Sequence, residues 1–266
     1  MRYYKKIRIQ KRFICIALLL ILISVLCFGC EICGTPENDF DAEQSQPAIS
    51  GTNKSESDIS PPIVCISALP EGFSYIDSSI IIELRYATSY NFTGAPVAGY
   101  EAQVGIMTSE GCAALLEAEH LAESMGYKLK VYDAYRPVRA VESFVAWAGN
   151  DDESMKDIFY PNISKKDLYS LGYISGRSAH SRGGAVDVAL VDINTLVELD
   201  MGSYFDFYDP ISHFHSELIS PEQQANRNTL RDIMERCGFR YYKNEWWHYI
   251  LIDEHFPDTY FDFPVQ

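Results

Sequence analysis

A short apolar run that contains a single carboxylate, AVDVALV at residues 185–191, constrains the fold of this chain more than any other feature. Its valines, alanines and leucine are typical of a β-strand. A carboxylate within such a run is costly unless it is paired with a cation or bound to a metal ion. The run therefore predicts a strand that presents Asp187 to a cationic partner.

Strand-like and helix-like runs alternate on both sides of this strand. Further strands are expected at residues 79–86, 127–132 and 246–252. Apolar residues at helical spacing predict helices at residues 109–125, 139–147 and 221–237, the first followed by Gly126 and the last opened by a capping box at residues 220–223. The spacing is not that of regular βαβ units. We therefore expect an α+β fold, with one domain built on a central, mainly antiparallel sheet packed by helices.

The N-terminal part of the chain indicates export. Six of the 22 basic residues precede residue 13, and an apolar run follows at residues 13–28. This is the order of a secretory signal, and Gly29-Cys30 is similar to the end of a lipobox, in which Cys30 would be lipidated. The alternative is an uncleaved membrane anchor. Either reading tethers the body of a bacterial protein to the outer side of the cytoplasmic membrane.

Composition divides the chain into three parts: a signal or anchor at residues 1–30, a polar linker at residues 31–62, and a folded domain at residues 63–266. The formal charge is −15, and residues 31–266 hold 16 basic and 37 acidic residues. A body this acidic is poorly suited to nucleic acid. It would suit a cationic substrate group, or it is simply a well-solvated surface.

The cysteines beyond the signal do not form a metal-binding pattern. Cys33, Cys65, Cys112 and Cys237 lack the C-x-x-C pairing of a structural zinc site. Export permits disulfides, but the sequence does not pair these cysteines. For Cys112 and Cys237, which fall in helical patterns, buried thiols are expected.

The first candidate for chemistry is SAHSRGGAVD at residues 178–187, where a polar loop turns through two glycines into the strand. Such a corner can bring His180 and Asp187 to one ion, and zinc binds both ligand types at about 2 Å. The alternative is a histidine in a polar loop beside an aspartate that caps a strand. The pattern alone leaves both readings open.

The second candidate is EWWH at residues 245–248. Side chains alternate along a strand, so Glu245 and His248 need a bend to reach one site. With Glu245 just before the strand, its carboxylate could lean over a metal ion held by His248 and take a proton from a bound water. The alternative is a surface glutamate and a packed histidine beside two core tryptophans.

The third candidate is DAYRP at residues 133–137, directly after a predicted strand. Side chains in such a turn often face a cleft. Arg136 could stabilise the oxyanion of a tetrahedral intermediate there. The alternative is a surface ion pair between Arg136 and Asp133.

Together these clusters resemble the zinc D,D-peptidases that cut D-alanyl-D-alanine, and more closely the VanX-type D-Ala-D-Ala dipeptidases. The resemblance covers about 200 residues, essentially the whole folded domain. It implies the zinc D,D-peptidase, or hedgehog-like, fold. Further segments carry it, namely residues 86–88, 91–94, 96–97, 99–101, 160–163, 201–203, 205–207 and 260–265.

The resemblance implies a metal site and two catalytic residues. His180, Asp187 and His248 would ligate one Zn²⁺ per chain, with water in the fourth position. Glu245 would take a proton from that water and pass it to the leaving amine. Arg136 would bind the substrate carbonyl oxygen as it gains charge.

The resemblance also implies three substrate contacts. Asp206 and Tyr86 correspond to residues that contact the free ammonium of the dipeptide, and Ser178 corresponds to a position near the substrate termini. A buried ammonium needs a counter-charge, and a blocked N-terminus would leave Asp206 unpaired. Ala179 stands where a second serine is common in the family, a difference that we expect to tune binding and not to abolish activity.

The expected function is hydrolysis of D-Ala-D-Ala by an exported zinc dipeptidase, in wall metabolism or glycopeptide resistance. Export departs from the family resemblance, whose members are mostly cytoplasmic. One alternative is a D,D-carboxypeptidase that trims D-Ala from stem peptides. The other is a non-catalytic wall-binding module on the same fold.

Overall fold

The computed structural model describes residues 68–266. The expected signal or anchor at residues 1–30, with Cys30, and the linker at residues 31–62 lie outside this range. Within residues 68–266, no helix has the length and apolar character needed to cross a membrane.

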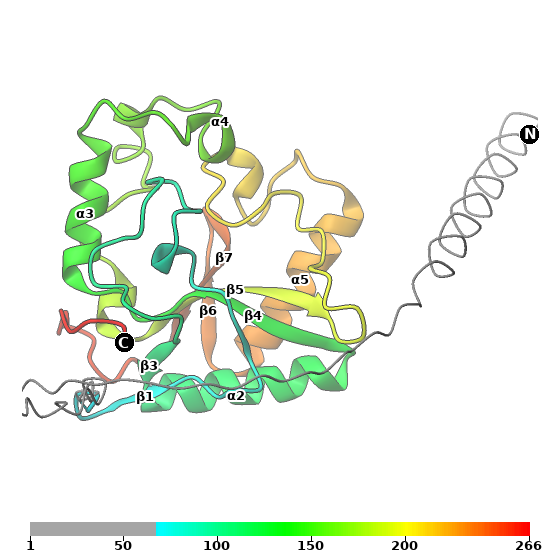
Figure 1. Cartoon of the computed structure of the whole chain (residues 1–266). Coiled ribbons are helices and arrows are strands. Elements are labelled where there is room, and N and C mark those ends of the chain that lie inside the picture. The colour runs from blue at the N-terminus through cyan, green and yellow to red at the C-terminus, as the bar shows by residue number, and fades with distance from the viewer. Residues whose placement is uncertain (1–67) are drawn as a thin grey trace, which may run out of the picture. The chain divides into compact units, whose positions relative to one another are not determined.

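The main sheet has five strands in the order β2-β4-β5-β7-β6 (Figure 1). In that order, they are β2 (Ile81–Ile82), β4 (Tyr127–Asp133), β5 (Ala185–Asp192), β7 (Glu245–Leu251) and β6 (Phe239–Tyr242). β2 is parallel to β4, and every other pair is antiparallel. The predicted α+β class with a mainly antiparallel sheet is confirmed.

β5 is the middle strand, and all its residues except Asp192 are buried. This position explains its sequence, because a strand with neighbours on both edges and cover on both faces reads as a continuous apolar run and not as an alternating one. The acid within its apolar run, Asp187, is 2% exposed. The predicted buried carboxylate therefore lies at the centre of the sheet.

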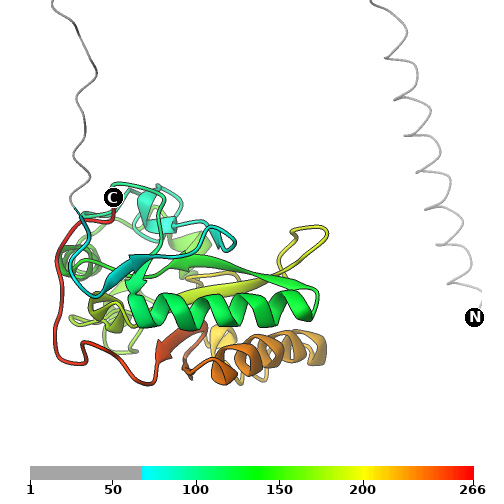
Figure 2. The same cartoon turned by 90° about the horizontal axis from the view of Figure 1, so that it is seen from below.

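Two helices, α2 (Ser109–Ser124) and α5 (Pro221–Arg236), lie side by side against one face of the sheet (Figure 2). At the start of α5, Ser220 and Gln223 make both hydrogen bonds of the predicted capping box. α2 ends before Gly126, whose φ of +88° places it in the left-handed region. The ends of these helices confirm the sequence prediction to within a residue or so.

The other face of the sheet is covered by α3 (Val138–Ala148), α4 (Lys156–Phe159) and long loops (Figure 1). These loops contain short 3₁₀ helices at η1 (Arg85–Ala87), η2 (Lys165–Asp167), η3 (Ala179–Arg182) and η4 (Pro210–Ser212). Because loop backbone must pass over the surface, this is the face on which clefts can form.

Some local predictions are wrong. The strand expected at residues 79–86 is reduced to Ile81–Ile82, because the chain then turns through η1 and buries Tyr86 in the core. Three strands of three or four residues were not predicted, since runs that short show little periodicity: β1 (Phe73–Tyr75), β3 (Ile106–Thr108) and β6. β1 and β3 form a separate antiparallel pair.

The two cysteines of the described residues are free thiols. Cys112 lies in α2, and burial raises its pKa to about 11. Cys237 lies just beyond α5, where a helical position was expected. Both side chains are half-buried and not fully buried. Cys33 and Cys65 lie outside the described residues.

Candidate active site

Three neighbouring strands place polar side chains in one row across the sheet. Asp187 on β5 is the register partner of His248 on β7 and of Asp133 on β4. Directly opposed residues on adjacent strands point to the same face of a sheet. A register shift between Val131 and Asp133 brings the β4 carboxylate into the row. The face is the one that lies opposite α2 and α5.

His180 joins this row from η3. The hydroxyl of Ser178 accepts a hydrogen bond from the His180 amide at the start of η3, and Gly183 ends the turn in the left-handed region. The His180 ring is 1% exposed, and its Nδ1 lies 2.6 Å from the carbonyl oxygen of Ala134. A carbonyl only accepts, so Nδ1 carries the proton and Nε2 presents its lone pair to the row.

The three donor atoms converge as metal ligands do. His180 Nε2 lies 3.1 Å from His248 Nδ1 and 3.3 Å from Asp187 Oδ1, and the last two atoms are 2.8 Å apart. Tetrahedral ligands about 2.0–2.2 Å from zinc are separated by roughly 3.3–3.6 Å, so the observed triangle is near that size. Burial lowers the pKa of His248, which keeps its imidazole neutral as a ligand must be. The set fits a divalent metal ion.

Asp133, next to Asp187 in this row, holds Arg136 in position. Its Oδ2 accepts from Nε and Nη2 of Arg136 at 2.8 and 2.7 Å, and its Oδ1 accepts from the Tyr100 hydroxyl at 2.6 Å. Arg136 Nη2 also lies 3.5 Å from Asp187 Oδ2. The two readings of DAYRP are therefore compatible, since the Arg136–Asp133 pair exists but is buried and holds the guanidinium on the pocket wall.

A bulge in β7 brings Glu245 to the same pocket as His248. Tyr241 pairs with Tyr249, yet the next residue of β6, Tyr242, pairs with Glu245, so three extra residues are accommodated on β7. This is the bend that the spacing of EWWH requires, although Glu245 begins the strand and does not precede it. Burial and the nearby charges of Asp187 and Asp206 raise the pKa of Glu245 well above its usual value, with Arg136 opposing them. A bound cation would lower it again.

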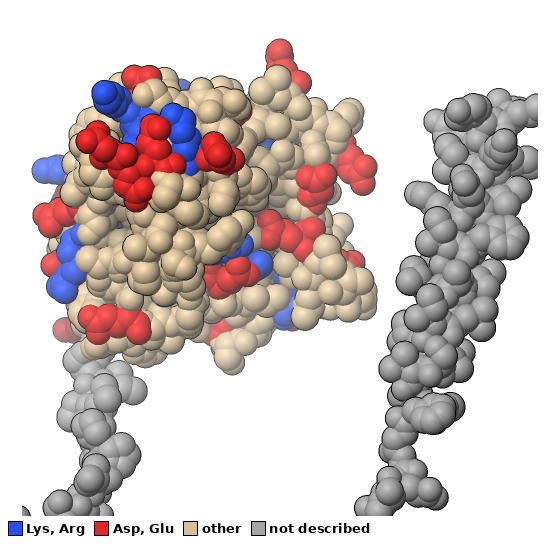
Figure 3. Space-filling view, turned by 45° about the horizontal axis from the view of Figure 1, so that its top comes forward, with Lys and Arg blue, Asp and Glu red and all other residues tan. Residues whose placement is uncertain are grey.

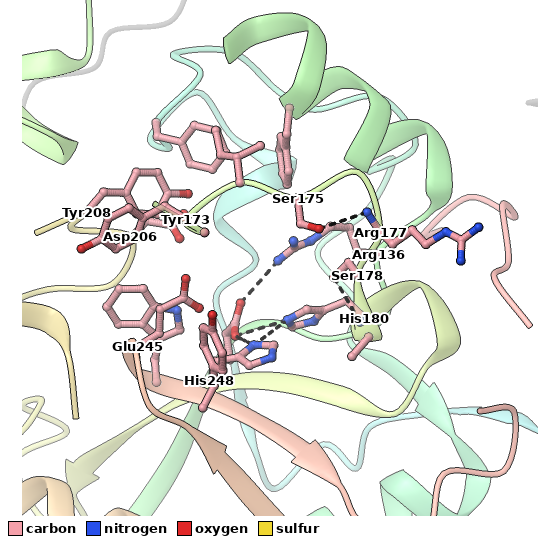
Figure 4. Close-up of a pocket in the computed structure, with 18 of the residues that line it drawn as sticks. Arg136, Tyr173, Ser175, Arg177, Ser178, His180, Asp206, Tyr208, Glu245 and His248 are labelled. Carbon is pink, nitrogen blue, oxygen red and sulfur yellow. Dashed lines mark hydrogen bonds and ion pairs between the residues drawn. The ribbon is translucent and has the colours of Figure 1, made fainter. Parts of the chain in front are cut away.

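Asp206 lies on the opposite side of the pocket from Ser178 (Figure 4). It is 3% exposed, has a φ of +63°, and accepts a hydrogen bond of 2.9 Å from the Tyr86 hydroxyl. Burial, then the charge of Asp187, raises its pKa well above the usual value. An ammonium group beside Asp206 would favour its ionised form.

One cavity of about 240 Å³ is lined by all eight residues proposed from the sequence. They are Tyr86, Arg136, Ser178, His180, Asp187, Asp206, Glu245 and His248. They converge from five separated stretches of the chain. The role of each residue stays a prediction.

The sequence analysis named Asp133 only as the partner of Arg136 in a surface ion pair and did not place it in the site. A local signal for its role existed, because Asp133 ends a strand three residues before Arg136. Two aromatic residues on the pocket wall, Tyr173 and Tyr208, were also not identified. Tyr173 is fixed by a contact of 3.1 Å between its hydroxyl and His213 Nε2, a pairing between distant loops that no local pattern reveals.

The comparison with protein families shows which family this chain belongs to. Residues 73–266 match the Peptidase_M15 family, described as D-ala-D-ala dipeptidase. The chain belongs to this family. As a Peptidase_M15 member, it is 44% identical over 199 residues to the D-alanyl-D-alanine dipeptidase of Enterococcus faecium, which covers 73% of this chain and 98% of that protein. It is 43% identical over 202 residues to the D-alanyl-D-alanine dipeptidase of Enterococcus faecalis, covering 74% and 100%.

Solved structures resemble this Peptidase_M15 chain only distantly. VanYB in complex with D-alanine-D-alanine aligns with a TM-score of 0.36 and 15% identity, over 68% of this chain and 82% of that one. A likeness this slight does not bear on the details of the site.

Proposed function

We propose that this protein is a zinc-dependent D-Ala-D-Ala dipeptidase that releases two D-alanines. The observation that carries the proposal is one pocket that is lined by a His-Asp-His donor set together with Glu245, Arg136 and the buried Asp206. Membership of the Peptidase_M15 family and relatives named D-alanyl-D-alanine dipeptidase support it.

His180, Asp187 and His248 would hold the metal ion. When bound, zinc supplies Lewis acidity that activates a water molecule near neutral pH and polarises a carbonyl group. Imidazole and carboxylate donors suit zinc, although such sets also accept other divalent ions. The carbonyl of Ala134 fixes the tautomer of His180, as partners of metal-binding histidines commonly do.

Glu245 and Arg136 carry the chemistry that the chain itself provides. Glu245 takes the proton of the attacking water on its carboxylate and delivers it to the nitrogen of the leaving D-alanine. Arg136, held by two hydrogen bonds to Asp133, places a fixed positive charge where the scissile carbonyl oxygen becomes negative. Its orientation costs nothing at the moment of reaction because it is already set.

Asp206 and Tyr86 give the site its preference for a free amine. A buried carboxylate gains most from a charged partner, so the dipeptide ammonium is favoured and an acylated nitrogen leaves Asp206 without one. This disfavours the D,D-carboxypeptidase alternative, in which the substrate nitrogen is part of a longer stem peptide. The joint occurrence of Glu245 and Arg136 with the donor set disfavours a non-catalytic wall-binding module.

The test is a product assay on purified protein. D-Ala-D-Ala and a pentapeptide ending in D-Ala-D-Ala are each incubated with and without a chelator, and D-alanine is measured. We expect release from the dipeptide that the chelator abolishes and zinc restores. Absence of chelator-sensitive release from both compounds contradicts an enzyme, and release mainly from the pentapeptide identifies a carboxypeptidase.

The role of Glu245 is tested by Glu245→Ala. Removing a general base that is not a ligand should lower kcat at least about 100-fold while one zinc per chain remains bound, as measured by atomic emission. Asp187→Ala is the matched variant, and it should lose the metal as well. Near-normal turnover by Glu245→Ala would refute the assignment of the base.

We further propose that the domain acts outside the cytoplasmic membrane, tethered through Cys30. There it would consume free D-Ala-D-Ala released by wall turnover, or lower the amount of D-Ala-D-Ala that a glycopeptide antibiotic can bind. This part rests on the order of basic residues, apolar run and Gly29-Cys30 at the N-terminus.

A further inference from the structure

Tyr173 and Tyr208 line the active-site pocket beside Asp206 (Figure 4). Their ring centres are 5.3 Å apart, and the rings are tilted by 33° to each other. Burial, followed by the charges of Asp206 and Glu245, raises the pKa of Tyr208 well above its usual value. The two rings therefore lie at the end of the pocket that holds Asp206, and the proposed function gives neither of them a role.

Tyr173 is fixed at both of its ends. Its backbone amide and that of Ile174 donate to the carbonyl oxygen of the buried Leu168 at 3.0 and 3.3 Å. Its hydroxyl lies 3.1 Å from Nε2 of His213. Burial raises the pKa of Tyr173 to about 12 and lowers the pKa of His213. At neutral pH, an uncharged hydroxyl and an uncharged imidazole therefore share one hydrogen bond.

His213 is itself anchored to the domain. Its carbonyl oxygen accepts from Nη1 of Arg227 at 2.6 Å, and its amide donates to the Pro210 carbonyl at 3.2 Å. His213 follows Asp206 in the connection between β5 and α5, whereas Tyr173 belongs to the connection between η2 and η3. The hydrogen bond between them, here called the Tyr173–His213 latch, therefore links two loops that both contribute to the pocket wall.

This end of the pocket would receive the first residue of the proposed substrate. The ammonium nitrogen and the methyl carbon of D-alanine are bonded to the same α-carbon, which places them about 2.5 Å apart. A substrate whose ammonium pairs with Asp206 therefore brings its first side chain to the residues around Asp206. A ring that is held in place excludes a larger side chain there, because overpacking a rigid wall is costly.

We propose that Tyr173 is a specificity-determining residue, and that the Tyr173–His213 latch holds its ring as the wall that limits the first substrate residue to the size of alanine. Tyr173 contacts the substrate, whereas His213 acts through Tyr173 and is a positioning residue. This inference rests on the proposed function. It leaves the cleavage of the peptide bond to Glu245 and Arg136.

The role of the ring is tested by comparing D-Ala-D-Ala with D-Leu-D-Ala on the zinc-loaded full chain. We expect the native protein to cleave D-Leu-D-Ala with a kcat/KM at least about 100-fold lower, the discrimination that an enzyme pocket can make against extra carbon atoms. Tyr173→Ala removes the ring and should narrow this ratio to about tenfold or less. An unchanged ratio in Tyr173→Ala overturns the assignment of Tyr173 as the wall.

The latch is tested by variants that keep the wall residue aromatic. Tyr173→Phe and His213→Ala each remove one partner of the hydrogen bond. Each should raise the KM for D-Ala-D-Ala up to about tenfold and lower kcat less than about twofold, because the wall bounds the substrate away from the reacting bond. His213→Gln, whose amide oxygen can accept from the Tyr173 hydroxyl, should restore most of the native KM.

Tyr241→Phe is the matched control. The Tyr241 hydroxyl lies 3.5 Å from Nε2 of His215 in a second contact between a tyrosine and a histidine, and neither of these residues lines the pocket. This variant should change neither the KM for D-Ala-D-Ala nor the ratio between the two dipeptides. An equal rise of KM in Tyr241→Phe and Tyr173→Phe overturns the latch.

A binding measurement separates this inference from the proposed function. In a calorimetric titration of D-Ala-D-Ala into the Glu245→Ala protein, adding Tyr173→Phe should raise Kd by the same factor as it raises KM in the active enzyme. Unchanged KM and Kd in both Tyr173→Phe and His213→Ala overturn the latch while dipeptide cleavage still supports the proposed function. Lack of dipeptide cleavage by the native chain overturns the proposed function, and the titration then decides whether the latch shapes the site.

Discussion

Gly183 is the residue at which the loop of His180 turns into the strand of Asp187. Its φ is +74°, and a Cβ atom there would lie 2.4 Å from Cε1 of Phe73. The Phe73 ring stacks on Phe256 at 5.7 Å and meets Phe261 edge-on at 4.9 Å, so it has little freedom to move away. Only glycine satisfies both the backbone conformation and the contact.

We therefore expect Gly183→Ala to lower the free energy of unfolding by roughly 2–5 kcal/mol, the sum of left-handed strain and overpacking. Urea denaturation would measure it. Gly126→Ala is the matched control, because Gly126 has a φ of +88° but no atom within 4 Å of an added Cβ. Equal losses in the two variants would show that the contact with Phe73 does not matter.

Asp133 shows how one residue can organise several others. It is fully buried, and burial raises its pKa, while Arg136 and the Tyr100 hydroxyl favour its charged form. Its Oδ2 also lies 3.6 Å from His180 Nδ1. A single carboxylate thus orients the proposed oxyanion-stabilising arginine next to a proposed metal ligand.

At the scale of elements, α5 holds the loop that carries Asp206. Arg227 of α5 is fully buried, and its guanidinium donates to the carbonyl oxygens of Met201, Ile211 and His213 at 2.7, 2.9 and 2.6 Å. Burial lowers its pKa to about 10, so it remains charged at neutral pH. The segment from Met201 to His213, which contains Asp206, is therefore held near both ends by one side chain of α5.

Arg227→Met should destabilise the protein by roughly 3 kcal/mol or more, because three buried carbonyls each lose a partner at about 1–3 kcal/mol. The KM for D-Ala-D-Ala should rise more than kcat falls, since the loop carries Asp206, the proposed ammonium contact, and none of the proposed metal ligands. Urea denaturation and steady-state kinetics measure the two effects. Arg227→Lys should recover part of the stability, and an unchanged KM in the methionine variant would confine Arg227 to folding.

At the scale of the whole molecule, the N-terminal segment and the rest of the chain carry charges of opposite sign. No acidic residue occurs before Glu31, whereas residues 31–266 are strongly acidic. On the face shown in Figure 3, the acidic side chains are scattered with basic ones between them, and they do not form one continuous patch. On this face, the distribution favours a solvated surface over a binding site for a polycation.

The proposed tether gives a prediction for the full chain. In cells given a labelled lipid precursor, the native protein should incorporate the label through Cys30, and Cys30→Ala should not. Cys33→Ala, which removes a nearby cysteine, should remain labelled. Absence of label from the native chain would favour the uncleaved anchor.

Local patterns were sufficient for the parts of the fold that neighbouring residues determine. The ends of α2 and α5 follow from Gly126 and from the capping box at Ser220, both of which act within a few residues. The strand at residues 185–191 follows from its composition, and the cost of burying a carboxylate singled out Asp187. Resemblance to a family then placed Asp206 and Tyr86, which no local pattern would have connected.

The tertiary structure decided what depends on contacts between distant segments. The register of β4, β5 and β7 placed Asp133, Asp187 and His248 in one row, and the bulge in β7 brought Glu245 to the same pocket. The turn at η1 replaced an expected strand because Tyr86 gains burial and a hydrogen bond to Asp206, 120 residues away. The sequence by itself thus determined which side chains can act as metal ligands and where the local helices and strands form. Strand pairing determined that these side chains converge on one site. The sequence could not show this, because the energy of strand pairing depends on which segments meet and not on their own composition.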